Sequence, residues 1–345
     1  MTDERGVSRR RYLQGIGTAT AGSAMLAGCS SATGSSGLDE LAVAYMPIYP
    51  DIQYFVMEEE GYFDELSVPV SGSQFPDGPS IVQASAKGDF DVMMFGIVPA
   101  MIIMDKGIPS KITAANIKDA MQILATDEFA GMWEEHGSDA FAEFEAQKGR
   151  KFTFGTFPPG SVPDILLRFW IDQTLGLDPE SDVDIRGLGG ATAVQQALLA
   201  GEVDGTSIME PVPTIIEAEG APFQPIAWAG EFMPGQPAAV TLMHDRLRND
   251  NRELATEFVR QHRRATTLAN DDPDTAASHA ASFIDSLDGS TARAAMDSRA
   301  SAFITDPHGI EEQATTFSEY ANRLGKTDAQ LSKSEMFDFG VYDSL

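Results

Sequence analysis

The chain has 345 residues and a formal net charge of −28, from 52 acidic and 24 basic side chains. This charge argues against a nucleic-acid-binding protein, because contacts with phosphates need a basic surface. It is typical of proteins adapted to concentrated salt, where screening over roughly 3 Å removes the self-repulsion of an acidic surface. The length exceeds that of one typical core and predicts two lobes.

The N-terminus has the architecture of an export signal. Paired arginines precede a tyrosine and a leucine in residues 8–14 (SRRRYLQ), and a weakly apolar stretch follows at residues 15–27. This stretch is too short to span a bilayer, which takes about 20 strongly apolar residues. It resembles a twin-arginine signal, which is an address read by a receptor. We expect residues 1–28 to be removed during export.

Cys29 ends a sequence that resembles a lipobox, Leu26-Ala27-Gly28-Cys29. Cleavage before Cys29 would leave its thiol at the new N-terminus, where it can be lipidated. Cys29 is the single cysteine of the chain, so it cannot form an internal disulfide. Residues 29–38 are rich in glycine and serine and read as a flexible tether. We therefore expect a protein that is lipid-anchored on the outer face of the cell membrane and does not span it.

An internal repeat predicts the architecture of the body. Residues 83–109 align without gaps onto residues 196–222, at a constant offset of 113. Each copy reads as a helix ending at a glycine (Gly88 or Gly201), a short buried strand, and a helix that begins near a proline. The predicted strands are residues 91–95 and 204–208. Two helix–strand–helix units, one in each half, predict two similar α/β lobes with a cleft between them.

The other predicted elements complete these lobes. The strands are 41–45, 152–156, 183–188 and 239–243, and the helices are 52–60, 161–173, 253–270, 273–287, 291–304 and 309–324. We expect lobe I to comprise residues 39–124 plus 239–345, and lobe II to comprise residues 125–238. The chain then crosses twice between the lobes and ends in a helical C-terminal block.

Several short segments match one known family in order and spacing. They are Gly61-Tyr62-Phe63, Gly88-Asp89-Phe90-Asp91 followed by Gly96-Ile97-Val98-Pro99, residues 148–152, Leu175-Gly176-Leu177-Asp178, residues 200–204 and Glu210-Pro211. Over about residues 40–275 the chain resembles the nitrate/sulfonate/taurine and thiamine-pyrimidine-precursor binding proteins of ABC importers, with a type II periplasmic-binding-protein fold. The resemblance implies a monomeric, hinged clamshell that captures a small molecule and presents it to a permease and its ATPase.

Residues near the predicted strand ends are the candidate ligand contacts, because ligands of open α/β sheets lie beyond the carboxyl ends of strands, near helix N-termini. The candidates are Tyr49, Gln53, Phe95, Gly96, Asn116, Thr156, Gly160, Ser161, Met209, Glu210 and Gln236.

The loops that carry most of these candidates contain no lysine or arginine. They are residues 45–55, 91–105, 153–167, 206–217 and 228–240. An oxyanion would have to rely on helix N-termini. A planar, neutral or cationic organic ligand could instead stack on aromatic rings, with Glu210 as acceptor. Both ligand classes stay open.

Other sites are not supported by the sequence. Gly187-Leu188-Gly189-Gly190 lacks the spacing of a dinucleotide-binding loop, and no G-x-S-x-G nucleophile motif occurs. The five histidines are dispersed without metal-ligand spacing. We expect no metal, no cofactor and no catalysis.

Two alternatives to an importer component remain. One is a ligand-sensing subunit that docks on a receptor. The other is an enzyme like the related eukaryotic synthases of a thiamine pyrimidine, although their cysteine-rich iron site has no counterpart in a chain with one cysteine.

Overall fold

The computed structural model describes residues 37–285 and 287–345. The predicted export signal, the lipidation site Cys29 and most of the predicted tether lie outside the described residues. Within those residues, no helix is both long enough and apolar enough to cross a membrane.

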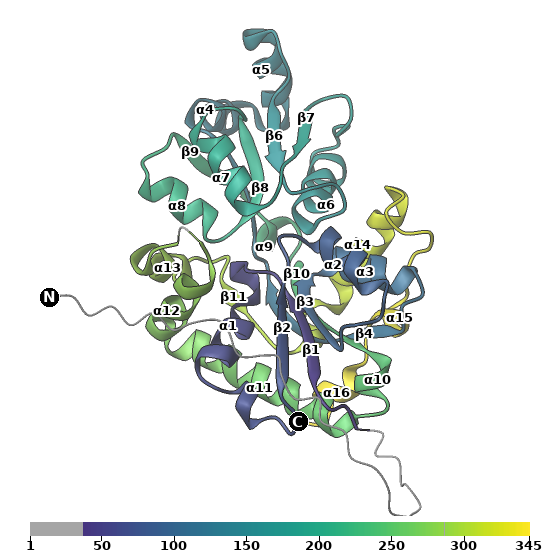
Figure 1. The fold of residues 1–345 in the computed structure, drawn as a ribbon. Helices are drawn as coiled ribbons and strands as arrows, with labels where there is room; N and C mark the ends of the chain where they lie inside the picture. Colours follow the sequence, from purple (N-terminus) through teal and green to yellow (C-terminus); the bar gives the residue numbers. More distant parts are fainter. Residues whose placement is uncertain (1–36, 286) are drawn as a thin grey trace, which may run out of the picture. The chain divides into compact units, whose positions relative to one another are not determined.

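Two mixed β-sheets organise the described chain (Figure 1). The six-stranded sheet has the order β11-β4-β10-β3-β1-β2 and the five-stranded sheet the order β7-β6-β8-β5-β9. We call the first sheet with its helices lobe I and the second lobe II. The strands of lobe I are β1 (Leu41–Tyr45), β2 (Val70–Gln74), β3 (Val92–Gly96), β4 (Ser110–Lys118), β10 (Pro237–His244) and β11 (Ala302–Phe303). Those of lobe II are β5 (Met121–Thr126), β6 (Thr153–Thr156), β7 (Asp184–Gly187), β8 (Gly205–Met209) and β9 (Phe223–Trp228).

The chain crosses between the sheets twice, from β4 to β5 and from β9 to β10. Two α/β lobes with two crossovers are therefore present. The boundary expected between residues 124 and 125 falls inside β5, which pairs with β8 and β9 of lobe II. The sheets divide the chain a few residues earlier, between β4 and β5.

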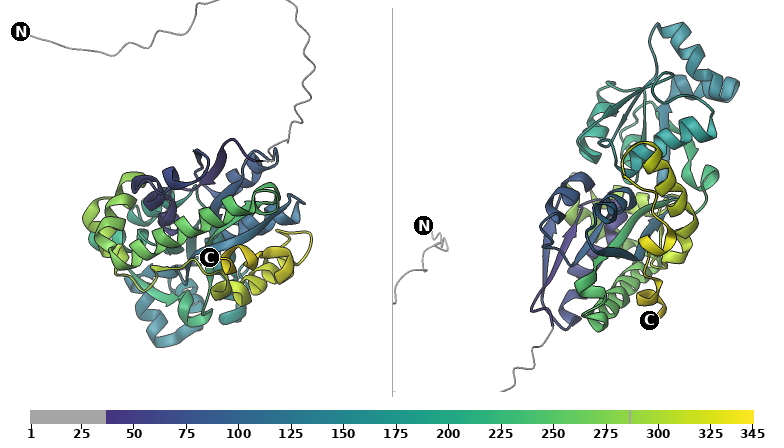
Figure 2. Two further views of the ribbon diagram at one scale, coloured as in Figure 1. Left: turned by 90° about the horizontal axis from the view of Figure 1, so that it is seen from below. Right: turned by 90° about the vertical axis from the view of Figure 1, so that its right-hand side faces the viewer.

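The helices of lobe I surround the six-stranded sheet. They are α1 (Ile52–Glu59), α2 (Gly78–Ser85), α3 (Ile97–Asp105), α10 (Asp245–Arg248), α11 (Arg252–Asp271), α12 (Pro273–Phe283), α13 (Gly289–Met296), α14 (Glu311–Arg323), α15 (Lys333–Met336) and α16 (Phe339–Asp343), with the short turns η1 (Tyr49–Asp51), η2 (Phe63–Glu65) and η5 (Pro307–Ile310). The long helix α11 packs along α1, and α14 contacts both α3 of lobe I and α6 of lobe II (Figure 2).

Lobe II has its own helices and a core rich in aromatic side chains. The helices are α4 (Asp127–His136), α5 (Ala140–Lys148), α6 (Val162–Phe169), α7 (Ala191–Leu199), α8 (Val212–Ala218) and α9 (Ala229–Phe232), with η3 (Gly137–Asp139) and the π-turn η4 (Trp170–Thr174). Phe129, Phe152 and Phe154 pack with Trp170 in a cluster that is fully buried. Such rings dominate core energetics and hold α4 and η4 against the sheet.

The predicted repeat is confirmed as a structural repeat. Its first copy is α2–β3–α3 and its second is α7–β8–α8. The glycines after the first helix of each copy, Gly88 and Gly201, have φ of 72° and 66°, in the left-handed region that disfavours side chains. Both strands are central: β3 lies beside β1 and β10, and β8 beside β6 and β5. The repeat thus places equivalent strand ends in the two lobes.

The helical C-terminal block is present, with one correction. The helix predicted for residues 291–304 ends at Met296, and Ala302–Phe303 form strand β11 on the edge of β4. Phe303 is buried there and pairs with Ile117, so sheet pairing prevails over helix continuation.

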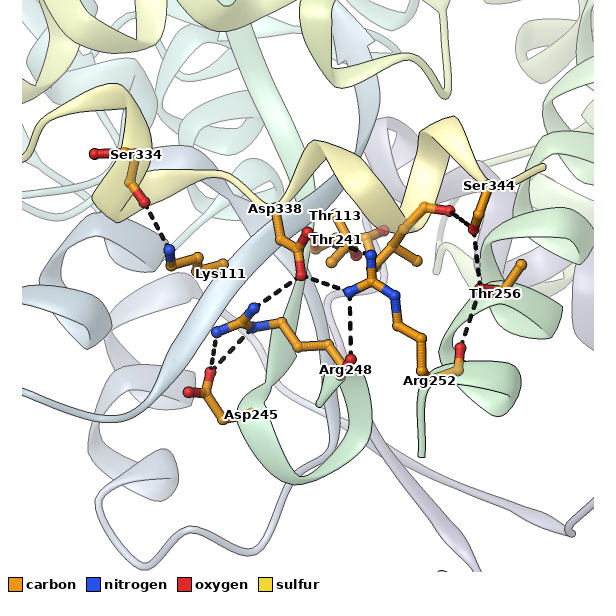
Figure 3. A network of polar contacts seen from close by, with 11 residues as sticks. Lys111, Thr113, Thr241, Asp245, Arg248, Arg252, Thr256, Ser334, Asp338 and Ser344 are labelled. Carbon is orange, nitrogen blue, oxygen red and sulfur yellow. Dashed lines mark hydrogen bonds and ion pairs between the residues drawn. The ribbon is translucent and has the colours of Figure 1, made fainter. Parts of the chain in front are cut away.

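A network of charged groups fixes the C-terminal segment to lobe I (Figure 3). Asp338 Oδ2 accepts hydrogen bonds from Arg248 Nη1 at 2.8 Å and Arg252 Nη1 at 2.7 Å. Arg248 also donates to Asp245 Oδ1 at 2.6 Å. Burial alone would raise the pKa of Asp338, but the hydrogen bonds from both arginines outweigh it and lower that pKa. The segment is therefore held by paired charges rather than by apolar contacts alone.

Candidate functional site

A small cavity lies between the lobes, at the ends of strands from both sheets. It measures about 20 Å³, which is room for little more than one water molecule. Its walls are largely apolar and include three methionines, so we call it the methionine cavity. The residues that line it are Met46, Ile48, Pro50, Gly78, Gly96, Pro99, Met121, Phe157, Ser161, Val162, Pro163, Met209, Ala238 and Ala239.

The methionines reach this cavity from three strand ends. Met46 follows β1, and Met121 and Met209 are direct partners in the antiparallel pair of β5 and β8. Residues opposite each other in such a pair project from the same face of the sheet. All three side chains are almost fully buried. Flexible, polarisable thioethers suit a wall that must adapt to an occupant.

A second cavity, of about 30 Å³, lies beside the first and shares Met209 with it. We call it the Glu210 cavity. It is lined by Pro47, Ile48, Tyr49, Ala191, Thr192, Gln195, Met209, Glu210, Pro211, Val212, Ile215, Ile284 and Asp285, which come from both lobes. A wider groove of about 390 Å³ lies on the other side of Glu210 and includes Gln122, Glu217, Asp297 and Ser298.

Glu210 is the buried carboxylate of this region. Its side chain is 4% exposed and its Oε1 accepts a hydrogen bond from Gln122 Nε2 at 3.1 Å. Oε2 accepts bonds from the Thr214 hydroxyl at 2.8 Å and the Thr214 backbone N–H at 3.3 Å. Burial raises the pKa of Glu210, and the hydrogen bonds partly offset that rise. The peptide bond between Glu210 and Pro211 is cis.

Five of the predicted contacts line the two cavities. Gly96, Ser161 and Met209 line the methionine cavity, and Tyr49 and Glu210 line the Glu210 cavity together with Met209. The lobes touch here, because a Cβ on Gly96 would come within 3.0 Å of Val162 Cγ2.

Tyr49 and Gly160 each have local bonds that fix their place. The Tyr49 hydroxyl donates to Met296 Sδ at 2.7 Å, and burial raises the pKa of this phenol. Gly160 lies on a separate interlobe groove, with α2 on the opposite side, and its N–H donates to Asp164 Oδ2 at 2.9 Å.

The structure places the other predicted contacts behind the cavity walls. Phe95 is fully buried in β3, and the Thr156 hydroxyl donates to the Ser207 carbonyl at 3.4 Å. Gln236 is fully buried in the second crossover, where its Nε2 donates to the Pro237 carbonyl at 2.5 Å. None of these three residues lines either cavity.

Gln53 and Asn116 belong to a buried polar network inside lobe I. Gln53 Nε2 donates to the Asn116 carbonyl at 2.7 Å, and Asn116 Nδ2 donates to Asp51 Oδ1 at 2.8 Å. Asn116 Oδ1 accepts from the Thr241 hydroxyl at 2.8 Å and lies 3.0 Å from His262 Nε2. The network ties η1, whose Tyr49 and Pro50 line the cavities, to β4, β10 and α11.

Burial disfavours the charged form of both ionisable members of this network. Burial raises the pKa of Asp51 to about 8 and lowers that of His262 to about 3. A protonated Asp51 and an uncharged His262 avoid placing a net charge in the interior, which would be costly without a partner.

Asp119 joins the two crossovers. Its N–H donates to the Gln236 carbonyl at 2.8 Å, and its Oδ1 accepts from the N–H groups of Gly235 at 2.7 Å and Gln236 at 2.9 Å. Its carbonyl accepts from Trp228 Nε1 at 2.7 Å. Asp119 has φ of 54°, the one positive value at a non-glycine residue in the described chain. Its backbone therefore lies in the left-handed region, which aspartate tolerates better than most residues with a side chain.

Contacts of other polar side chains also bridge the lobes. The Tyr320 hydroxyl of α14 donates to Asp172 Oδ2 at 3.1 Å, and Arg323 pairs with the same carboxylate. Arg299 pairs with Glu231 at 2.8 Å and lies over the Trp228 ring. These surface contacts favour the conformation in which the lobes touch.

Across residues 37–285 and 287–345, no group of three or more histidine, cysteine or acidic side chains could hold a metal ion. The walls of the two cavities combine many apolar side chains with the polar groups of Ser161, Thr192 and Gln195 and with the buried carboxylate of Glu210.

Comparison with known proteins places the chain in a family. Residues 34–284 match the NMT1-like family. The chain belongs to this family. The bicarbonate-binding protein CmpA of Synechococcus is 22% identical over 269 residues, which are 69% of this chain and 59% of CmpA. The chain thus corresponds to only about three-fifths of that relative's length.

Solved structures similar to this NMT1-like chain show its fold. The nitrate-binding protein NrtA of Synechocystis superimposes with a TM-score of 0.73 at 13% identity, covering 89% of this chain and 88% of NrtA. The aliphatic sulphonate-binding protein SsuA of Escherichia coli gives a TM-score of 0.70 at 14% identity, covering 88% and 92%. The predicted fold, that of type II periplasmic binding proteins, is confirmed.

Sequence reasoning missed Met46 and Met121 as cavity residues of this NMT1-like chain. Met46 immediately follows β1, and a search for apolar residues after the first strand would have included it. Met121 begins β5 directly after the first crossover. No strand is predicted from the sequence over residues 121–126, so nothing there marks Met121 as the end of a strand.

Proposed function

We propose that this chain is the solute-binding component of an ABC importer. It captures a small organic solute or an oxyanion between lobes I and II and delivers it to a permease. The observation that carries the proposal is the position of the two cavities: they lie between the sheets, at the ends of β1, β3 and β8, and residues of both lobes line them. Ligands of open α/β sheets bind at such strand ends.

The relatives support this reading. CmpA is named for bicarbonate, NrtA for nitrate and SsuA for sulphonates. We infer that the present chain also binds its solute without chemical conversion. Tyr49, Gly96, Ser161, Met209 and Glu210 are the proposed contacts, and Met46 and Met121 join them.

We further propose that residues 1–28 direct export by the twin-arginine route and that Cys29 is lipidated. The protein would then be tethered to the outer face of the membrane, in a habitat of high salt. Cys29→Ser should move the protein from the membrane fraction to the medium without changing its fold. Retention of the variant in the membrane fraction would argue against the lipid anchor.

A binding screen tests the solute-binding proposal. Melting temperatures are measured in multimolar KCl with nitrate, bicarbonate, sulfonates, pyrimidines, flavins and small amines. A solute at 100 times its Kd stabilises the folded state by about 2.7 kcal/mol. We expect at least one class to raise the melting temperature, and the proposal fails if none does.

A matched pair of variants locates that binding. Gly96→Val inserts a side chain where even a Cβ would meet Val162, so it should block the cavity and abolish the shift. Gly131→Val, on exposed α4 with open space around it, should leave the shift intact. Undiminished binding by Gly96→Val would place the site elsewhere.

The alternative function, a ligand-sensing subunit that docks on a receptor, differs from the proposed function only in the partner protein. If the chain serves a receptor, its loaded form should fail to stimulate the ATPase of the importer in membrane vesicles. An enzyme would consume the solute that raises its melting temperature, which chromatography of the incubated solute would detect.

A further inference from the structure

The two interlobe cavities and the groove beside Glu210 have no cationic side chain in their walls, whereas Lys106 lines the separate groove that contains Gly160. No lysine, arginine or histidine lines the methionine cavity, the Glu210 cavity or the groove beside Glu210. The same walls carry the carboxylates of Glu210 and Glu217. An anion entering here would meet negative charge and no compensating side chain.

The nearby cation Arg293 does not alter this balance. It lies on α13, next to Ala294 of the groove, and pairs with Asp274 at 2.5 Å and Asp297 at 2.7 Å. Its charge is therefore matched by two carboxylates, and burying a further anion beside it would leave that anion uncompensated.

Helix N-termini are the other means of binding an anion, and prolines weaken them here. Free backbone N–H groups in the first turn normally supply the hydrogen bonds. Proline has no N–H group to donate. Four of the five helices that begin at the interlobe cavities and grooves have one in their first three residues: Pro79 in α2, Pro99 in α3, Pro163 in α6 and Pro213 in α8. The fifth, α7, has no proline there, and its Ala191 and Thr192 line the same cavity as the carboxylate of Glu210.

The chain's own carboxylates occupy three of these helix starts. Asp77 Oδ1 accepts the N–H of Ser80 at the start of α2, at 2.8 Å. Asp164 lies in the first turn of α6 and accepts the N–H of Gly160 at 2.9 Å. Glu210 accepts the N–H of Thr214 in α8. At these three helix starts, a carboxylate of the chain itself therefore already occupies the place that a bound oxyanion would take.

We infer that the cleft selects a compact solute that carries no negative charge, either neutral or monocationic, and rejects oxyanions. This inference rests on the proposed solute-binding function and specifies its substrate class. The cavities of about 20 and 30 Å³ favour a solute of few heavy atoms. Glu210 supplies the acceptor for its N–H groups, because a carboxylate oxygen can accept more than one hydrogen bond.

Four planar solutes of nearly equal size test directly whether the cleft rejects solutes that carry a negative charge. Nitrate and bicarbonate are anions, urea is neutral and guanidinium is a cation, so charge varies while shape is nearly constant. Isothermal titration calorimetry on the full chain in multimolar KCl, with each solute at millimolar concentration, measures their affinities. We expect urea or guanidinium to bind at least about tenfold more tightly than either anion.

The outcomes separate this inference from the proposed function. Preferential binding of nitrate or bicarbonate overturns the inference that the cleft rejects oxyanions, but it supports the proposed solute-binding function. Absence of binding by all four overturns the inference of a compact uncharged or cationic solute, while the broader screen still decides the function. Binding of urea or guanidinium that Gly96→Val does not abolish also overturns it, because the site would then lie outside the cleft.

A charge-neutralising variant tests the role of Glu210. Glu210→Gln keeps one side-chain oxygen to accept the bonds from Thr214, and its NH2 group can donate to the oxygen of Gln122 once that amide is flipped, so the local fold should persist. Guanidinium affinity should fall by about tenfold or more, and urea affinity should fall less, because only guanidinium loses a charge pair. Glu219→Gln, exposed at the end of the same helix, is the matched control and should change neither affinity. Equal guanidinium affinity in Glu210→Gln and wild type would contradict this assignment.

Discussion

Asp51 lies fully buried behind the cavity walls, and its ionisation is coupled to the stability of lobe I. Its Oδ1 accepts the Asn116 amide, while burial raises its pKa to about 8. An acid whose pKa is raised by folding holds its proton longer in the native state, so stability falls as the pH rises toward the folded pKa. His262, with its pKa lowered to about 3, has the opposite effect, which is complete near its ordinary pKa of 6.5. Between pH 6.5 and 8, Asp51 therefore causes most of the change in unfolding free energy that this pair contributes.

Asp51→Asn should remove that dependence. The amide oxygen can still accept from Asn116, but the residue no longer titrates. Relative to Asp51→Asn, the wild type should lose about 2 kcal/mol of unfolding free energy between pH 6.5 and 8. Denaturant unfolding of both proteins at the two pH values measures the difference. An equal pH dependence in both proteins would mean that Asp51 does not titrate in this range.

Single residues show how far local sequence predicts position. Gly96, Met209 and Glu210 lie at the ends of the repeat strands and line the cavities, and their role as ligand contacts stays a prediction. Gln53 and Asn116 are equally polar and equally close to strand ends, yet they bond within lobe I. Their partners Asp51, Thr241 and His262 are distant in sequence, and only the folded chain brings them together.

At the scale of the elements, the crossovers form the connection between the lobes, and Asp119 holds them together. Asp119→Ala would leave the N–H groups of Gly235 and Gln236 without their acceptor and keep a positive φ at a residue with a Cβ. We expect a loss of about 2–3 kcal/mol in unfolding free energy.

Asp119→Asn is the matched variant. Asparagine tolerates positive φ and retains the accepting oxygen, so its cost should stay below about 1 kcal/mol. Urea unfolding curves of the two variants measure both costs. Equal destabilisation would show that the charge of Asp119, and not its geometry, matters.

The ends of the helices follow from the local sequence more closely than the pairing of the strands does. The repeat glycines and prolines delimit α2, α3, α7 and α8 within a few residues of expectation, because helix ends depend on local backbone preferences. Strands β2, β4, β5, β9 and β11 are not predicted from the sequence. The edge strand β11, for example, has only two residues, which gain strand structure by pairing with β4.

At the scale of the whole molecule, the net charge of −28 should make stability depend on salt. The Debye length falls from about 10 Å at 0.1 M to about 3 Å at 1 M, so repulsion between acidic groups weakens. The melting temperature should rise steadily from 0.1 to 2 M KCl. It should rise much less with sucrose at matched osmolality, which adds no screening. A melting temperature independent of KCl would contradict adaptation to high salt.

Closure of two lobes on one solute is the central claim, and hydrogen exchange tests it most directly. With the solute that raises the melting temperature most, the backbone amides of residues 94–101 in lobe I and 207–214 in lobe II should both exchange more slowly. Those of α5 (residues 140–148), outside the cavities, should exchange as before. Slower hydrogen exchange in only one of these two segments, or in neither, would contradict binding between the lobes.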